Sequence, residues 1–137
     1  MLYTNSFSKQ DATRVILKTT GIKSNVLKIQ KMKNGAFLIV FWDLASKKKL
    51  ARFVSKNDLL RVKFERTIER ARQVVFDPKG QTTTGYTATL SSCNCPAFQD
   101  VEQVLFVGGQ KVCKHTLSYA KKFLGCQKLS DFMRLSA

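Results

Sequence analysis

The sequence predicts an α+β fold, in which an N-terminal helix and a small antiparallel sheet precede a module of one β-hairpin and one helix. Apolar residues recur at helical spacing between Ser8 and Gly21, and strand-like segments flank Asn34-Gly35. A second pair of strand-like segments leads to a Cys/His pattern and a final helix. Because 137 residues suit one domain or two small lobes, we expect a basic α+β lobe over 1–71 and the second module over 72–137.

Local signals define the first elements. Ser8 has the position of a helix N-cap and Gly21 that of a helix end. Asn34-Gly35 favours a tight turn, with an alternating strand from Val26 before it and the apolar run 36–42 after it. These segments predict a helix followed by a β-hairpin.

The rest of the first lobe contains a third strand and a second helix. The third strand is expected at 50–54, after a loop that contains Lys47-Lys48-Lys49. Ser55 or Asn57 can cap a helix that continues as far as residue 72. Within it, the segment 62–64 fits a strand equally well.

In the second module, strands are expected at 72–76 and 86–91, around the turn signal Asp77-Pro78-Lys79-Gly80. The last predicted helix covers 115–124 and ends at Gly125. One face of this helix carries Leu117, Ala120 and Leu124, and the other is expected to form a basic stripe of Lys114, Ser118, Lys121 and Lys122.

The chain is strongly basic, with 24 Lys and Arg residues against 9 Asp and Glu and a net charge of +15. Residues 1–76 hold 17 basic and 5 acidic side chains, and residues 77–137 hold 7 and 4. Such a field attracts polyanions, and nucleic acid is the commonest intracellular polyanion. A solubilising surface and a patch that meets an acidic protein are the alternatives.

Composition also excludes several classes of protein. The 44% hydrophobic content argues against disorder of the whole chain. The longest apolar run, residues 36–42, is far shorter than a bilayer span, and the N-terminus lacks the pattern of a secretory signal. We therefore expect no membrane association and an intracellular location, cytoplasmic or nuclear.

The motif Cys93-Asn94-Cys95 is followed, after 17 residues, by Cys113-Lys114-His115. Three thiolates and one imidazole suit a closed tetrahedral Zn²⁺ site, which is a structural rather than a catalytic arrangement. The one histidine of the chain falls in this pattern. The sequence therefore predicts one structural zinc ion bound by Cys93, Cys95, Cys113 and His115.

Three alternative roles for these residues fit less well. Disulfides are disfavoured in an intracellular protein, and a nucleophilic Cys113–His115 pair would leave the first two cysteines unexplained. A core histidine is disfavoured by its polar neighbours Lys114 and Thr116. Cys126 lies outside the motif and is expected to be a small core residue, although it can substitute for a ligand.

The Cys-x-Cys…Cys-x-His pattern resembles the SWIM zinc finger. The resemblance covers about residues 74–124, including a hairpin that ends in Cys93-Asn94-Cys95-Pro96-Ala97-Phe98, and the first 70 residues are unassigned. Members occur in Mutator-like transposases, chromatin remodellers, recombination mediators and some ubiquitin ligases. The resemblance implies a SWIM-like module that binds DNA or protein and has no chemistry of its own. Val104–Val107, inside the spacer, is an extra hairpin or a partner-docking surface.

No catalytic grouping is present in the sequence. It has no phosphate-binding Gly-rich loop and no Gly-x-Ser-x-Gly, and its acidic residues are scattered, without the spacing of a two-metal site. We therefore expect a protein that is not an enzyme and has no small-molecule substrate.

The leading functional hypothesis is a DNA-binding protein that contacts backbone phosphates, an accessory factor in transposition, recombination or regulation. Duplex DNA is favoured over single strands and RNA, because Trp42 and the ten Phe residues, Phe98 among them, can stack on bases but are expected in the core. The alternative is an adaptor that docks a protein through Val104–Val107. The candidate phosphate contacts are Lys47, Lys48, Lys49, Arg52, Lys56, Lys111, Lys114, Lys121 and Lys122.

Overall fold

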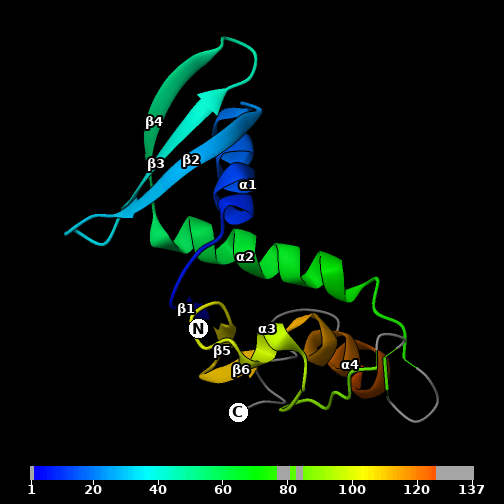
Figure 1. Cartoon of the computed structure of the whole chain (residues 1–137). Coiled ribbons are helices and arrows are strands. Elements are labelled where there is room, and N and C mark those ends of the chain that lie inside the picture. Colours follow the sequence, from blue (N-terminus) through cyan, green and yellow to red (C-terminus); the bar gives the residue numbers. More distant parts are fainter. Residues whose placement is uncertain (1, 77–80, 83–84, 126–137) are drawn as a thin grey trace. The chain divides into compact units, whose positions relative to one another are not determined.

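The computed structural model describes residues 2–76, 81–82 and 85–125 (Figure 1). Helices and two three-stranded antiparallel sheets make up this part of the chain, which confirms the α+β prediction. The elements in order are β1 (Leu2–Thr4), α1 (Lys9–Thr20), β2 (Ser24–Lys31), β3 (Phe37–Asp43), β4 (Lys48–Val54), α2 (Lys56–Ala71), α3 (Pro96–Gln99), β5 (Leu105–Val107), β6 (Gln110–Val112) and α4 (Lys114–Leu124).

The chain divides into two compact units. One is Phe7–Lys63, which we call the basic unit. In the other, which we call the cysteine unit, Met1–Ser6 joins Phe64–Ala137. The division falls inside α2, and strand β1 belongs to the cysteine unit although the whole basic unit follows it in the sequence.

In the basic unit, helix α1 covers one face of the sheet β2–β3–β4 (Figure 1). Ser8 caps the helix: its hydroxyl accepts from the Asp11 N–H at 3.2 Å, and the Asp11 carboxylate accepts from the Ser8 N–H at 3.0 Å. Gly21 ends the helix at a φ of 74°, in the left-handed region. The core between helix and sheet contains Ala12, Val15, Ile16, Val26, Phe37, Ile39, Phe41 and Val54.

Strand β3 is central in this sheet, between β2 and β4. The predicted hairpin at Asn34-Gly35 is confirmed, and Gly35 has the positive φ of 86° that such a turn requires. Lys48 and Lys49 belong to β4 rather than to the preceding loop. The expectation that Trp42 lies in the core is wrong, since its side chain is 39% exposed on the face away from α1.

Helix α2 begins after Ser55, whose hydroxyl accepts from the Asp58 N–H at 3.1 Å. It continues without interruption to Ala71. The segment 62–64 is therefore helical, and its strand alternative is wrong.

The sheet of the cysteine unit has the order β1–β5–β6, so the first strand of the chain pairs with a strand that begins about one hundred residues later. The buried Thr4 hydroxyl donates to the Val104 carbonyl at 2.9 Å. Strands β5 and β6 form a hairpin through Gly108 and Gly109, so the extra-hairpin prediction for the spacer is confirmed. Because Val104, Leu105 and Val107 are buried, this segment is not an exposed apolar patch.

The hairpin expected from residues 72–91 is reduced, in the described part of this segment, to isolated β-bridges. They pair Phe76 with Thr82, Gln81 with Thr87, and Ala88 with Cys93. The turn at 77–80 lies outside the described residues. The last predicted helix is confirmed as α4, which ends at Gly125 with a φ of 73°. No helix in the described part of the chain has the length and apolar character to cross a membrane.

Candidate metal centre

Short elements of the cysteine unit position the four residues of the Cys/His motif. Cys93 is held by its bridge to Ala88, and Cys95 is the residue before the single turn α3, which Pro96 begins. Cys113 precedes α4, and His115 lies in the first turn of that helix. The Thr116 hydroxyl fixes this helix start, accepting from the Cys113 N–H at 2.9 Å and donating to the Cys113 carbonyl at 3.1 Å.

The four side chains converge on one point. Their ligand atoms all lie within 4.8 Å of one another, and all four residues are buried. His115 Nδ1 is 3.6 Å from Cys93 Sγ and 3.8 Å from Cys113 Sγ. Bonds of about 2.3 Å to sulfur and about 2.0–2.1 Å to nitrogen place the ligands of a tetrahedral zinc ion about 3.6 Å apart. The cluster therefore has the dimensions of a single zinc site.

The three cysteines of the cluster are free thiols, so the disulfide alternative is excluded for them. Burial raises the pKa of Cys93 and of Cys113, because a thiolate is costly away from water. A bound cation reverses this preference by stabilising the thiolates. The three buried thiols and the imidazole, at this spacing, thus form a ligand set that suits a soft or borderline metal ion. Cys126 lies outside the described residues.

His115 points its Nδ1 atom toward the thiols. Its ring packs against Tyr86 at a centroid distance of 5.3 Å. Burial, then the positive charges of Lys114 and Arg70, lower the pKa of His115, which favours the neutral imidazole that a metal requires. With Nδ1 as the ligand atom, the remaining proton is on Nε2, which becomes a hydrogen-bond donor.

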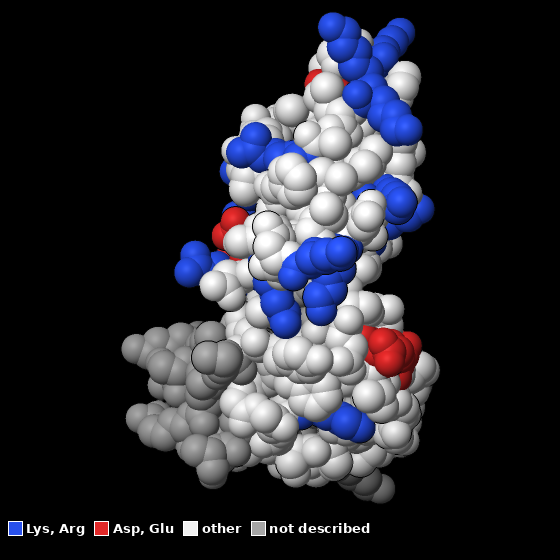
Figure 2. All heavy atoms as spheres, turned by 90° about the vertical axis from the view of Figure 1, so that its left-hand side faces the viewer, with Lys and Arg blue, Asp and Glu red and all other residues white. Residues whose placement is uncertain are grey.

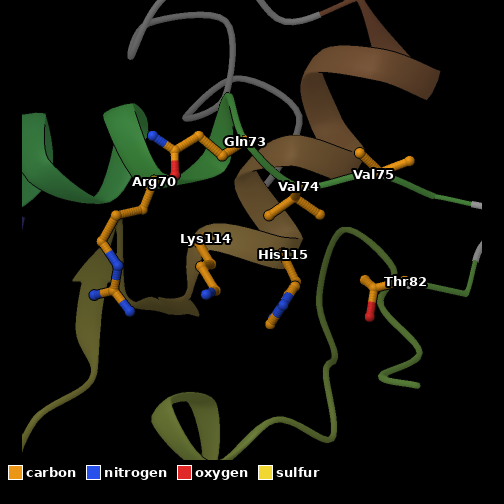
Figure 3. Close-up of a pocket in the computed structure, with 7 residues that line it drawn as sticks. All are labelled: Arg70, Gln73, Val74, Val75, Thr82, Lys114 and His115. Carbon is orange, nitrogen blue, oxygen red and sulfur yellow. The ribbon is translucent and has the colours of Figure 1, made fainter. Parts of the chain in front are cut away.

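A pocket of about 210 Å³ lies beside this histidine. In Figure 3, the side chains of Arg70, Lys114 and His115 extend in the same direction into it. The remaining lining residues are Gln73, Val74, Val75 and Thr82, so none of the described lining residues is acidic. Two cationic groups and an imidazole N–H can bind an anion with oxygen acceptors, such as a phosphate.

The nine candidate phosphate contacts occupy both units. In the basic unit, Lys47 forms the turn before β4 with a φ of 56°, Lys48, Lys49 and Arg52 lie on β4, and Lys56 begins α2. In the cysteine unit, Lys111 lies on β6, and Lys114, Lys121 and Lys122 lie on α4.

Two of these lysines contact aromatic rings of their own unit. The Lys111 ammonium is 5.5 Å from the centroid of the Phe98 ring, and the Lys122 ammonium is 5.5 Å from that of Phe76. Lys122 also donates to the Val74 carbonyl. Phe98 is buried beside the cysteines, which confirms its predicted core role.

The expected division of α4 into two faces is partly wrong. Ser118 is buried rather than part of an exposed basic stripe, and Leu124 is exposed rather than packed. Sequence reasoning also missed Arg70, Gln73 and Thr82 as neighbours of His115. No local pattern marks them, since only the folded chain brings the end of α2 to the start of α4.

No protein-family model matches this chain, and the searches of curated proteins and of solved structures found no match either. The zinc-finger interpretation therefore depends on the geometry of the Cys93, Cys95, Cys113 and His115 cluster.

Proposed function

We propose that the chain is a zinc-stabilised nucleic-acid-binding protein that contacts backbone phosphates and catalyses no reaction. The observation that carries the proposal is the charge of the basic unit. Its Lys and Arg residues are Lys9, Arg14, Lys18, Lys23, Lys28, Lys31, Lys33, Lys47, Lys48, Lys49, Arg52, Lys56, Arg61 and Lys63, against the acids Asp11, Asp43 and Asp58. Most of the +15 net charge thus belongs to this unit.

The distribution of these charges on the surface supports the proposal. Figure 2 shows Lys and Arg side chains over much of the upper part of the displayed face, where few acidic atoms are visible. A surface of this kind attracts a polyanion and releases its counterions on binding. The pocket of Arg70, Lys114 and His115 supplies a second region suited to a phosphate.

Zinc is the metal we propose, because three cysteines and one histidine form a closed tetrahedral site that is typical of structural zinc. The order Cys-x-Cys then Cys-x-His, with a helix that begins at the second pair, supports assignment to the SWIM type. That resemblance is also the basis for an accessory role in transposition, recombination or regulation. The adaptor alternative depended on exposure of Val104–Val107 and is not proposed, because most of that segment is buried.

The decisive experiment is a titration of the zinc-loaded protein with duplex DNA, single-stranded DNA and RNA at several salt concentrations. We expect tight binding of at least one form, with log Kobs falling linearly against log salt concentration. Alanine at Lys47, Lys48 and Lys49 is expected to reduce that slope by roughly one for each phosphate that is no longer neutralised.

The matched control replaces Lys9, Lys23 and Lys33 by alanine, which removes the same charge from the same unit. An equal effect of both triple variants would show that only the total charge matters. Weak and indistinguishable binding of all three nucleic acids at about 150 mM salt, where nonspecific contacts already fade, would reject the proposed function.

A further inference from the structure

The sheet of the basic unit has one covered face and one open face. Along β3, the alternate residues Phe37, Ile39 and Phe41 are buried against α1. The residues between them, Leu38, Val40 and Trp42, therefore point to the opposite face. The register places Phe53 beside Leu38, and Lys49 beside Trp42, on that same face. On β2, the partners of Leu38, Val40 and Trp42 are Gln30, Lys28 and Asn25.

Two aromatic side chains are exposed on this open face. Trp42 is 39% exposed and Phe53 is 63% exposed. Large aromatic groups contribute most to stability when they are buried, so exposing two of them on one sheet face is unfavourable unless they contact a ligand. Between them, Leu38 and Val40 are half-buried and continue the apolar surface.

The charge of this face indicates which ligand fits. Lys28 and Lys49 lie among the apolar residues on the same face, within a unit whose basic residues far outnumber its acidic ones. The positive charge opposes the approach of a second copy of this chain and favours a polyanion. A polyanion that also offers flat apolar groups is a nucleic acid with unpaired bases.

The spacing of the two rings also suits a single strand. Trp42 and Phe53 lie on adjacent strands, four residues apart along the sheet, which corresponds to roughly 14 Å from a rise of about 3.3 Å per residue and a strand separation of about 4.8 Å. One extended strand crossing the sheet can therefore place different bases on the two rings. In a duplex the base faces are already stacked on each other and are not available to these rings.

We propose that the open face of the sheet β2–β3–β4 binds single-stranded nucleic acid, with bases stacked on Trp42 and Phe53 and phosphates held by Lys28 and Lys49. The proposal rests on the proposed nucleic-acid function and specifies the form of nucleic acid that this surface binds. It reverses the preference for duplex DNA, which depended on a buried Trp42.

Trp42 is the one tryptophan of the chain, so tryptophan fluorescence reports on the open face of the sheet. The experiment titrates the full-length, zinc-loaded protein with a mixed-sequence single-stranded oligonucleotide and with the corresponding duplex. Binding is followed by anisotropy of a labelled strand and stacking by the fluorescence of Trp42. We expect the single strand to bind more tightly than the duplex and to quench Trp42.

Variants of Phe53 test the stacking contact directly. Phe53→Ala is expected to weaken single-strand binding by roughly 5- to 150-fold, the loss typical of one base-stacking contact, whereas Phe53→Tyr retains a ring and retains binding. Leu17→Ala is the matched control, because Leu17 is 46% exposed in the same unit but lies on α1. Both residues are exposed, so neither truncation removes a core side chain.

Each other outcome overturns the proposal. If the protein binds nucleic acid but Trp42 fluorescence does not change, or if Phe53→Ala affects binding no more than Leu17→Ala, the open face is not the site, and the proposed function survives. If no form of nucleic acid binds, both this proposal and the proposed nucleic-acid function are rejected. If Phe53→Ala dissociates a dimer seen by sedimentation, the face pairs two copies of this chain instead.

Discussion

The Nδ1 atom of His115 lies 3.6 Å from the Sγ atom of Cys93, although 22 residues separate them in the sequence. This distance links the start of α4 to the bridge that Cys93 forms with Ala88. In the described part of the chain, few helices or strands join the segment around Cys93 to the start of α4. A metal ion bound at this cluster would therefore hold together a unit whose own strands are short.

Removing the metal is expected to unfold the cysteine unit and leave the basic unit folded. Metal binding to a closed site contributes folding free energy on the order of 10 kcal/mol in small zinc peptides, whereas the basic unit has its own core of Ile16, Ile39 and Phe41. Circular dichroism should lose helix on chelation while the emission of Trp42 stays unchanged. Unaltered dichroism and melting after verified metal removal would contradict a structural metal.

Replacing a ligand should have the same effect as chelation. Cys93→Ser is expected to remove the bound metal and lower the melting temperature, because a serine hydroxyl does not replace a thiolate at a soft site. Cys126→Ser is the control and is expected to retain one metal ion per chain, as measured by elemental analysis. Loss of the metal from the Cys126 variant would refute the assignment of the four ligands.

Metal affinity should fall as the pH is lowered. Burial raises the pKa of Cys93 and Cys113, so both thiols are protonated at neutral pH without metal, and a metal ion must displace those protons. The apparent affinity should drop by roughly a factor of 10 per pH unit for each displaced proton. Competition with a chromophoric chelator between about pH 8 and pH 6 measures it, and an affinity independent of pH would contradict the thiolate ligands.

Arg70 and Arg72 offer a test of the pocket beside His115. Arg70 lines the pocket and Arg72, two residues on, does not. Arg70→Gln should reduce the slope of log Kobs against log salt concentration by about one, the value of one phosphate contact. Arg72→Gln removes the same charge and should reduce this slope less. Equal slopes for the two variants would show that the pocket does not contact nucleic acid.

Thr4→Val should destabilise the cysteine unit by about 1 kcal/mol, because the buried hydrogen bond to the Val104 carbonyl is removed. Tyr3→Phe is the neighbouring control, since the hydroxyl of Tyr3 bonds to Asn5 at the surface. Chemical denaturation followed by circular dichroism measures the free energy of unfolding of both variants. If Tyr3→Phe lowers this free energy as much as Thr4→Val, the buried hydrogen bond contributes no more to stability than the exposed one.

Predictions from sequence succeeded where the cause is local. The cap formed by Ser8 and Asp11, the turn at Gly35 and the spacing of the Cys/His motif each depend on residues close together in the chain, and the structure contains all three. The strand expected at 86–91 was not found because its polar residues bond locally. The Thr89 hydroxyl, for example, accepts from the Ser92 N–H at 3.2 Å, which competes with a ladder.

Features that depend on distant partners were not accessible to sequence reasoning. The continuous apolar run 36–42 does not indicate which side of its strand a helix will cover, so the core positions expected for Trp42 and, on the neighbouring strand, for Phe53 are both wrong. Strand β1 is too short to be recognised without its partner β5. Arg70 lines the same pocket as His115 although 45 residues separate them in the sequence.

The pairing of β1 with β5 also sets an order of events during synthesis. Residues 7–63 form one contiguous unit and can fold soon after they leave the ribosome. Residues 2–4 are made before that unit, yet their partner strand appears only at Leu105–Val107. Strand β1 therefore has no partner while residues 7–63 are synthesised, and the candidate ligands Cys113 and His115 emerge after β5.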